Sequence, residues 1–157
     1  MFALNLLLAL SNVVALLPLY LVHQQHDLIT LHCVMFVSSM SFISHLLENH
    51  KHAMTGINGI SSSVSYWFNR LDVLGCIIMT LRLTYMYLVT NGFQVHEYLM
   101  NPEIWLLILN SFVVLRLSEY DQLNSEIRTQ YVVTHIVWHI NAYVMTYFLL
   151  LNTVYYV

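Results

Sequence analysis

The sequence is short of charge. Only 8% of its 157 residues are Asp, Glu, Lys or Arg, whereas 59% are hydrophobic. A typical soluble domain carries about 25% charged residues, so this composition excludes an ordinary soluble protein. It predicts an integral membrane protein, in which apolar segments of ~20 residues each cross about 30 Å of hydrocarbon.

Basic residues and cysteines are also scarce. The five Lys and Arg residues are scattered and form no stripe that could neutralise phosphates, which excludes a nucleic-acid partner. The two cysteines, Cys33 and Cys76, fall in different apolar runs at different expected depths. A disulfide needs its two residues close together, so we expect both thiols to be free.

Five apolar runs organise the chain, at residues 2–22, 28–47, 71–90, 104–117 and from about 130 to the end. The first run has no Lys or Arg before it, which favours a transmembrane helix over a cleaved signal peptide. The fourth begins with Asn101, Pro102 and Glu103, a typical helix start, but it is short enough to suit a re-entrant segment as well. We predict an all-α, polytopic bundle of about five transmembrane helices that forms a single domain over residues 1–157.

The long connection at residues 49–65 contains two glycines and a run of serines, which predicts a loop. We expect its His50 and His52 to be solvated, with a lid as the alternative. Four of the five basic residues fall on the side of the membrane where the chain begins, which the positive-inside rule identifies as cytosolic (Lys51, Arg70, Arg116 and Arg128). The fifth, Arg82, is expected to pair with Asp27 or to extend toward the opposite side.

This topology brings four ionisable residues to one depth near the cytosolic side. His45 lies near the end of the second span, Asp72 in the first turn of the third, and His135 and His139 near the start of the last. The spacing of His135 and His139 places both rings on one helix face, and Ser41 has the same spacing from His45.

Three histidines with an open fourth position form the catalytic type of zinc site. Zinc lowers the pKa of water and polarises carbonyl groups, and a carboxylate at the position of Asp72 can take a proton from that water. Simpler interpretations exist for each residue. Asp72 could be only an acidic residue at the start of a helix, at the level of the lipid headgroups. His135 and His139 could form hydrogen bonds to lipid headgroups, and Ser41 could contribute only to helix packing.

The motifs S41-x-x-x-H45, L71-D72-V73-L74-G75 and H135-x-x-x-H139 resemble those of the CREST superfamily of membrane hydrolases. This superfamily includes alkaline ceramidases and the progestin and adipoQ receptors. The resemblance implies zinc ligands His45, His135 and His139, with Asp72 and Ser41 beside the metal. It also implies that the zinc site lies toward the cytosol.

The chain departs from the family in having room for about five spans where the family has seven. With two spans fewer, the last helix still begins on the same side of the membrane. The lipid pocket would be smaller, or a second subunit would complete it. The leading hypothesis is a zinc-dependent hydrolase of a lipid amide, such as a ceramide, or of an ester. The alternatives are a zinc-containing lipid sensor with little turnover and a non-catalytic helical membrane protein whose histidines bind haem or nothing.

Overall fold

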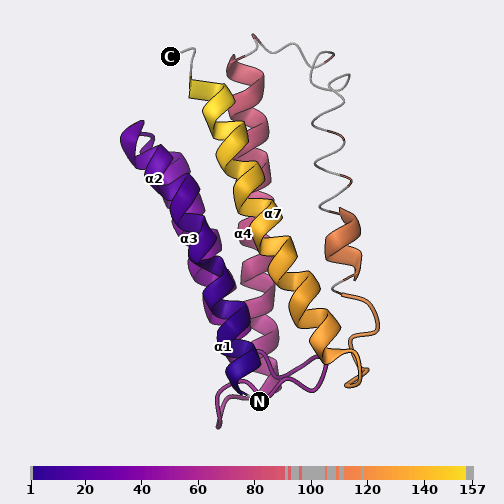
Figure 1. The fold of residues 1–157 in the computed structure, drawn as a ribbon. Helices are drawn as coiled ribbons and strands as arrows, with labels where there is room; N and C mark the ends of the chain where they lie inside the picture. Colours follow the sequence, from indigo (N-terminus) through magenta and orange to yellow (C-terminus); the bar gives the residue numbers. More distant parts are fainter. Residues whose placement is uncertain are drawn as a thin grey trace.

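The protein is a bundle of long helices. The computed structural model describes residues 2–90, 92, 96, 105, 109, 112–117 and 119–154, and no strand occurs in these residues. Figure 1 shows the long helices running side by side along one axis. In chain order they are α1 (Phe2–Ser11), the 3₁₀ segment η1 (Asn12–Ala15), α2 (Leu16–Gln24), α3 (Leu28–Leu47), α4 (Ser62–Thr90) and α7 (Arg128–Val154). The predicted all-α class is confirmed.

Three helical stretches are long and apolar enough to cross a membrane. They are Phe2–Gln24, which comprises α1, η1 and α2, followed by Leu28–Leu47 and Ser62–Thr90. The first two agree with the runs predicted at 2–22 and 28–47. The predicted fourth span at 104–117 lies largely outside the described residues, although residues 112–117 are helical.

A short turn reverses the chain between α2 and α3. Asp27 caps α3, since its Oδ1 accepts a hydrogen bond of 3.1 Å from the backbone N–H of Thr30. Arg82 of α4 donates from Nη2 to Asp27 Oδ2 over 2.8 Å. The predicted pairing of Arg82 with Asp27 is therefore confirmed, and it ties the start of α3 to α4.

Helix α4 begins nine residues earlier than the apolar run predicts. Ser61 Oγ accepts a hydrogen bond of 3.3 Å from the backbone N–H of Val64, so the serine run starts the helix instead of belonging to the loop. Hydropathy marks only the apolar part of a helix, and the polar first turns of α4 carry no such signal. As a result Asp72 is not in the first turn, as predicted, but in the fourth.

Gly75 allows α3 and α4 to approach closely. A Cβ atom at this position would lie 3.0 Å from Val37 Cα and 3.1 Å from Val37 Cβ. Such distances are tighter than ordinary carbon contacts of about 3.5–4.0 Å. The glycine is thus required where the two backbones come closest, three residues after Asp72.

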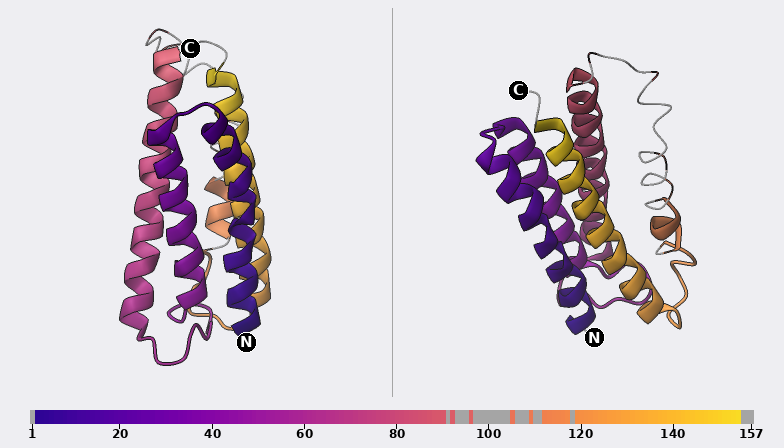
Figure 2. Two further views of the ribbon diagram at one scale, coloured as in Figure 1. Left: turned by 90° about the vertical axis from the view of Figure 1, so that its left-hand side faces the viewer. Right: turned by 45° about the horizontal axis from the view of Figure 1, so that its top comes forward.

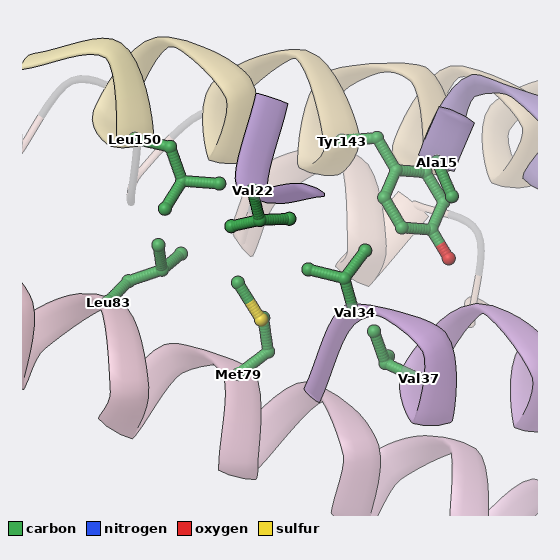
Figure 3. Packing of buried hydrophobic residues seen from close by; sticks show 8 residues of the cluster. All are labelled: Ala15, Val22, Val34, Val37, Met79, Leu83, Tyr143 and Leu150. Carbon is green, nitrogen blue, oxygen red and sulfur yellow. The ribbon is translucent and has the colours of Figure 1, made fainter. Parts of the chain in front are cut away.

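Two apolar clusters fill the bundle, with a polar layer between them. The larger cluster joins residues of η1, α2, α3, α4 and α7, whose side chains point toward one another in Figure 3 (Ala15, Val22, Val34, Val37, Met79, Leu83, Tyr143 and Leu150). The smaller one lies near the start of the chain (Leu8, Met54, Tyr131 and Val132). Along α7, His135 and His139 fall between the two clusters. Cys33 and Cys76 are both free, as predicted.

The bundle has two distinct ends. At one end, Asn5 Nδ2 of α1 donates to the carbonyl oxygens of His45 and Glu48 at the end of α3, over 2.9 and 2.8 Å. At the other end, Thr90 Oγ1 of α4 donates to the carbonyl of Thr153 in α7 over 3.4 Å. Both views of Figure 2 show the chain start and the start of α7 at the same end. We call this the site end.

Candidate metal centre

Three histidines from two helices meet inside the bundle near the site end. His45 of α3 and His135 and His139 of α7 offer nitrogen atoms that all lie within 4.8 Å of one another. Their ring centroids are 4.5 to 4.9 Å apart, and the three residues are 96% or more buried. This cluster can hold a metal ion, because its size and chemistry match three imidazole ligands of one cation.

The two ring nitrogens of His45 have different surroundings. Nδ1 lies 3.0 Å from Glu48 Oε2, and an ionised carboxylate can only accept, so Nδ1 carries the proton and donates. Nε2 is buried and makes no hydrogen bond within the described part of the chain. Asp72 Oδ2 lies 3.9 Å from Nε2. With the proton on Nδ1, a neutral ring points the lone pair of Nε2 toward a carboxylate, an arrangement that a cation bound to Nε2 would stabilise.

His139 is oriented in the same way. The Ser11 hydroxyl donates its proton to the Leu8 carbonyl over 2.6 Å, so it accepts the hydrogen bond from His139 Nδ1. The lone pair is then on Nε2, which lies 3.2 Å from Ser41 Oγ. Ser41, Asp72 and His139 also line one small cavity. The Ser41 hydroxyl therefore lies beside a metal-ligand candidate and near the carboxylate.

His135 has a carboxylate on its outer side. Its Nδ1 lies 3.8 Å from Glu119 Oε1, which belongs to the connection before α7. Lys51 Nζ in turn lies 2.7 Å from Glu119 Oε1 and 3.4 Å from Glu48 Oε1. One ammonium group thus bridges the two carboxylates that contact His45 and His135.

Glu48 is buried just beyond the end of α3, with 1% exposure. Tyr131 donates from its hydroxyl to the carboxylate, 2.7 Å from each oxygen. Burial alone would raise the pKa of Glu48, but the charge of Lys51 and the hydrogen bonds from His45 and Tyr131 outweigh it and lower the pKa to about 2. Burial likewise favours neutral Lys51, yet Glu48 and Glu119 raise its pKa. The pair is ionised at neutral pH.

The loop after α3 is only partly solvated, whereas the sequence predicted solvation for both His50 and His52: residues 57–59 are exposed, but Lys51, His52 and Met54 are buried. His52 has no exposed surface, stacks on Tyr131 with ring centroids 4.4 Å apart, and places Nδ1 3.2 Å from the Asn124 carbonyl. His50 is half-buried, and that burial lowers its pKa. The loop folds inward because Gly56, with φ +53°, lets the backbone pass against Leu47, where a Cβ would lie 2.5 Å from the carbonyl oxygen.

A cavity of about 590 Å³ opens beside the cluster, and both Asp72 and His135 line it. Its wall is polar toward the site end, where the lining includes His50, Asn69, Arg70 and Gln122. The remainder is apolar and lies between α4, α7 and residues 112–117, with a lining that includes Val73, Ile77, Leu81, Phe112 and Trp138. A second cavity of about 100 Å³ lies among Ser41, Asp72 and His139. A molecule with a polar head and an apolar tail would fit the larger cavity.

The five residues that the sequence singles out, Ser41, His45, Asp72, His135 and His139, are all buried in this one place. The sequence interpretation missed Glu48, Lys51 and Glu119. Glu48 follows His45 by three residues, a spacing that brings side chains together at a helix end. In a chain with only eight acidic residues, that spacing was a usable signal. No local pattern connects Glu119 to His135, because the contact depends on the fold.

Comparison with known proteins gives a viral relative. The sequence is 44% identical over 151 residues to the uncharacterized protein L282 of Acanthamoeba polyphaga mimivirus, and the match covers 96% of this chain and 99% of the viral protein. The chain belongs to the L282 family. No protein-family model matches it, and no solved structure matches it. For this L282-family chain, the resemblance to CREST hydrolases stays a prediction from its own motifs.

Proposed function

We propose that this protein is an integral-membrane, zinc-dependent hydrolase that acts on a lipid amide or ester. The observation that carries the proposal is His45 Nε2, a buried nitrogen that makes no hydrogen bond within the described residues and lies 3.9 Å from the Asp72 carboxylate. A divalent cation bound by His45, His135 and His139 would satisfy this nitrogen and balance the carboxylate.

The charges around the cluster support a divalent ion. Three carboxylates, Glu48, Glu119 and Asp72, face the histidines, whereas Lys51 supplies one ammonium. With these groups ionised and the histidines neutral, two negative charges are left in a buried place. Buried charges are stable only when they are paired. Nitrogen-rich ligand sets favour zinc over magnesium or calcium, which prefer oxygen.

The surface supports a lipid environment. Large apolar side chains point outward along α1, α2, α3, α4 and α7, and the exposed ones include Leu7, Leu16, Ile29, Ile77 and Phe148. The polar residues of the histidine cluster are inside. Soluble proteins rarely expose apolar faces of this extent. We infer a multi-pass membrane protein of about five spans, with the lipid bilayer as its solvent and as the source of its substrate.

The proposed chemistry divides between the ion and the chain. Zinc, when bound, supplies Lewis acidity toward a carbonyl oxygen and acidifies water. Asp72 takes a proton from the water that attacks the carbonyl carbon, and it later returns that proton to the leaving amine or alcohol. Ser41, which lines one small cavity with Asp72, donates one hydrogen bond to the water or to the developing oxyanion. The cavity of about 590 Å³ accepts the acyl chain along its apolar wall.

The experiment compares wild type with Asp72→Asn and Ser41→Ala in detergent. Asp72→Asn should keep most of the zinc, because Asp72 is not a ligand, but lose ~10²-fold or more of its turnover. Ser41→Ala should lose less, roughly 1–4 kcal/mol of transition-state stabilisation. Release of fatty acid from ceramide and other long-chain N-acyl lipids and esters is measured together with zinc content. The control is Asp121→Asn, an exposed aspartate in the loop before α7.

Each outcome assigns a function. Equal activity in wild type and Asp72→Asn would remove Asp72 from the mechanism. A zinc-loaded wild type that hydrolyses no lipid amide or ester would favour a lipid sensor at the same site. Protein that contains no metal would favour a structural role, in which a protonated His45 lies between Glu48 and Asp72. A haem absorption band would indicate a different cofactor.

A further inference from the structure

Glu48 has more contacts to the site than its position outside the cluster suggests. It is the first residue after α3, yet its carboxylate is almost completely buried, with 1% exposure. It accepts hydrogen bonds from His45 Nδ1 over 3.0 Å and from the Tyr131 hydroxyl over 2.7 Å, and it pairs with Lys51 at 3.4 Å. An ionised carboxylate buried at this depth has a desolvation cost that its partners must offset.

The backbone around Glu48 is fixed as well. Asn5 of α1 donates to the carbonyl oxygens of both His45 and Glu48. Tyr131, in the first turn of α7, stacks on His52 and lies one helical turn before His135. The backbone of Glu48 is therefore held by α1 and its carboxylate by Lys51 and Tyr131, so the carboxylate cannot turn away from His45 without breaking contacts.

The consequence for His45 is a defined tautomer. A histidine with a free choice of proton position spends part of its time with Nε2 protonated, and an N–H group cannot bind a metal. A carboxylate on Nδ1 removes that choice, because it requires the proton on its own side. In the neutral ring the lone pair is then on Nε2, the nitrogen that lies 3.9 Å from Asp72 Oδ2.

We propose that Glu48 is a positioning residue of the metal centre, which acts through His45 and is itself held by Tyr131 and Lys51. This inference rests on the proposed function, since it requires that His45, His135 and His139 bind a metal. Its role is distinct from that of Asp72. Glu48 lies behind the ligand, on Nδ1, whereas Asp72 lies in front of it near Nε2.

The test measures metal affinity of the full-length protein in detergent. Zinc affinity is determined by competition with a chelating indicator, and Co²⁺ is substituted for zinc because its visible absorption bands report coordination geometry. Glu48→Gln keeps the size of the side chain but replaces one acceptor oxygen with an NH₂ group. It should weaken zinc binding by ~10–100-fold and alter the Co²⁺ bands. Glu126→Gln, at an exposed glutamate in the loop before α7, is the matched control and should change neither.

A second variant covers the case in which Glu48→Gln does not fold. Tyr131→Phe keeps the ring that stacks on His52 and removes only the hydroxyl that donates to Glu48. It should weaken zinc binding by ~2–10-fold. Only samples whose metal-free form shows a cooperative thermal transition are compared, which separates affinity from folding.

The outcomes separate this inference from the proposed function. A wild type that binds no zinc overturns the metal centre itself. A wild type that binds zinc tightly, together with a folded Glu48→Gln variant of equal affinity and unchanged Co²⁺ bands, overturns only the role of Glu48. If Glu48→Gln does not fold, unchanged affinity in Tyr131→Phe overturns it instead.

Discussion

His45 shows how the partners of a single residue define its chemistry. One ring nitrogen is bound to a buried carboxylate, and the other faces two histidines and an aspartate without a hydrogen bond inside the described chain. A structural histidine in a core normally has both nitrogens satisfied, because a buried polar atom without a partner costs about 1–3 kcal/mol. One ring nitrogen with a carboxylate partner and one without a hydrogen bond is the arrangement expected of a histidine that binds a metal.

The first prediction concerns the three histidines. His45→Ala, His135→Ala and His139→Ala should each abolish near-stoichiometric zinc binding, because two remaining imidazoles do not form a tight zinc site. Metal content is measured by elemental analysis of protein purified without chelator. His96→Ala is the control, since His96 is exposed and far along the chain from the cluster. A full complement of zinc in any of the three cluster variants would contradict the assignment.

The sequence predicted the residues at the centre of the site and missed the charged residues that surround them. Ser41, His45, Asp72, His135 and His139 could be found because helical spacing and span topology bring them to one depth. Glu119 and Lys51 could not, because they lie in connections whose path hydropathy does not determine. His52 was misjudged for the same reason. A loop was equated with solvent exposure, but His52 within this loop is buried and stacks on Tyr131 of α7.

Among the elements, α3 and α4 form the closest pair, and their contact sets the position of Asp72 relative to His45. The sequence predicted the bounds of α3 correctly, because its apolar run and its helix coincide. It placed the start of α4 too late, because the first turns are polar and are stabilised by a serine cap. Element boundaries of this kind depend on hydrogen bonds that hydropathy does not measure.

The second prediction is that Gly75→Ala destabilises the protein. Alanine is favoured over glycine in a helix by about 1 kcal/mol, but the added Cβ would meet Val37 Cα at 3.0 Å. Overpacking of this kind costs about 1–3 kcal/mol, and a backbone atom cannot rotate away. The net loss of unfolding free energy should be up to about 2 kcal/mol. Thermal unfolding measures it, with the exposed Ser63→Ala of the same helix as control.

The third prediction concerns pH and the cap of α3. Burial would raise the pKa of Asp27, but hydrogen bonds from Thr30 and Arg82 and the charge of Arg82 together lower it below 3.8. A lowered folded-state pKa means that the stabilisation is present above the ordinary pKa and is lost as the pH falls through the folded value. Asp27→Asn keeps a cap but loses the ion pair.

The stability gap between wild type and Asp27→Asn should therefore be largest near neutral pH, at about 1 kcal/mol. It should shrink as the pH drops below 3.8. Unfolding midpoints across this range provide the measurement. A gap that is constant with pH would show that the charge of Asp27 contributes nothing, and Asp121→Asn should show no comparable trend because that aspartate is exposed.

The whole molecule places polar groups inside and apolar side chains outside, which is the reverse of a soluble protein. Its polar layer lies between two internal apolar clusters, and its outer faces carry leucine, isoleucine and phenylalanine. Composition alone predicted this arrangement, since a chain with 8% charged residues cannot cover its surface with them. It could not predict that the few charges would gather inside. Asp72, Glu48 and Lys51 are all more than 90% buried.

The last prediction is the topology that this arrangement implies. Lys51 bonds Glu119, Arg128 bonds the His52 carbonyl over 2.8 Å, and Arg70 lines the same cavity as Glu119, so these basic residues share the site end. Arg82 binds Asp27 next to the α2–α3 turn. From the positive-inside rule we expect the site end to face the cytosol. The start of α1 belongs to this end and the end of α7 to the other.

We therefore expect the N-terminus on the cytosolic side and the C-terminus on the opposite side. Thr90 lies at the far end of the bundle and Arg128 at the site end, as an odd number of spans requires. Reporter tags at each terminus, tested for protease access in sealed vesicles, measure the orientation. Tags accessible from the same side would refute an odd number of spans. The metal centre would then need a different account, because His45 and the two histidines of α7 reach one depth only if the chain crosses between α4 and α7.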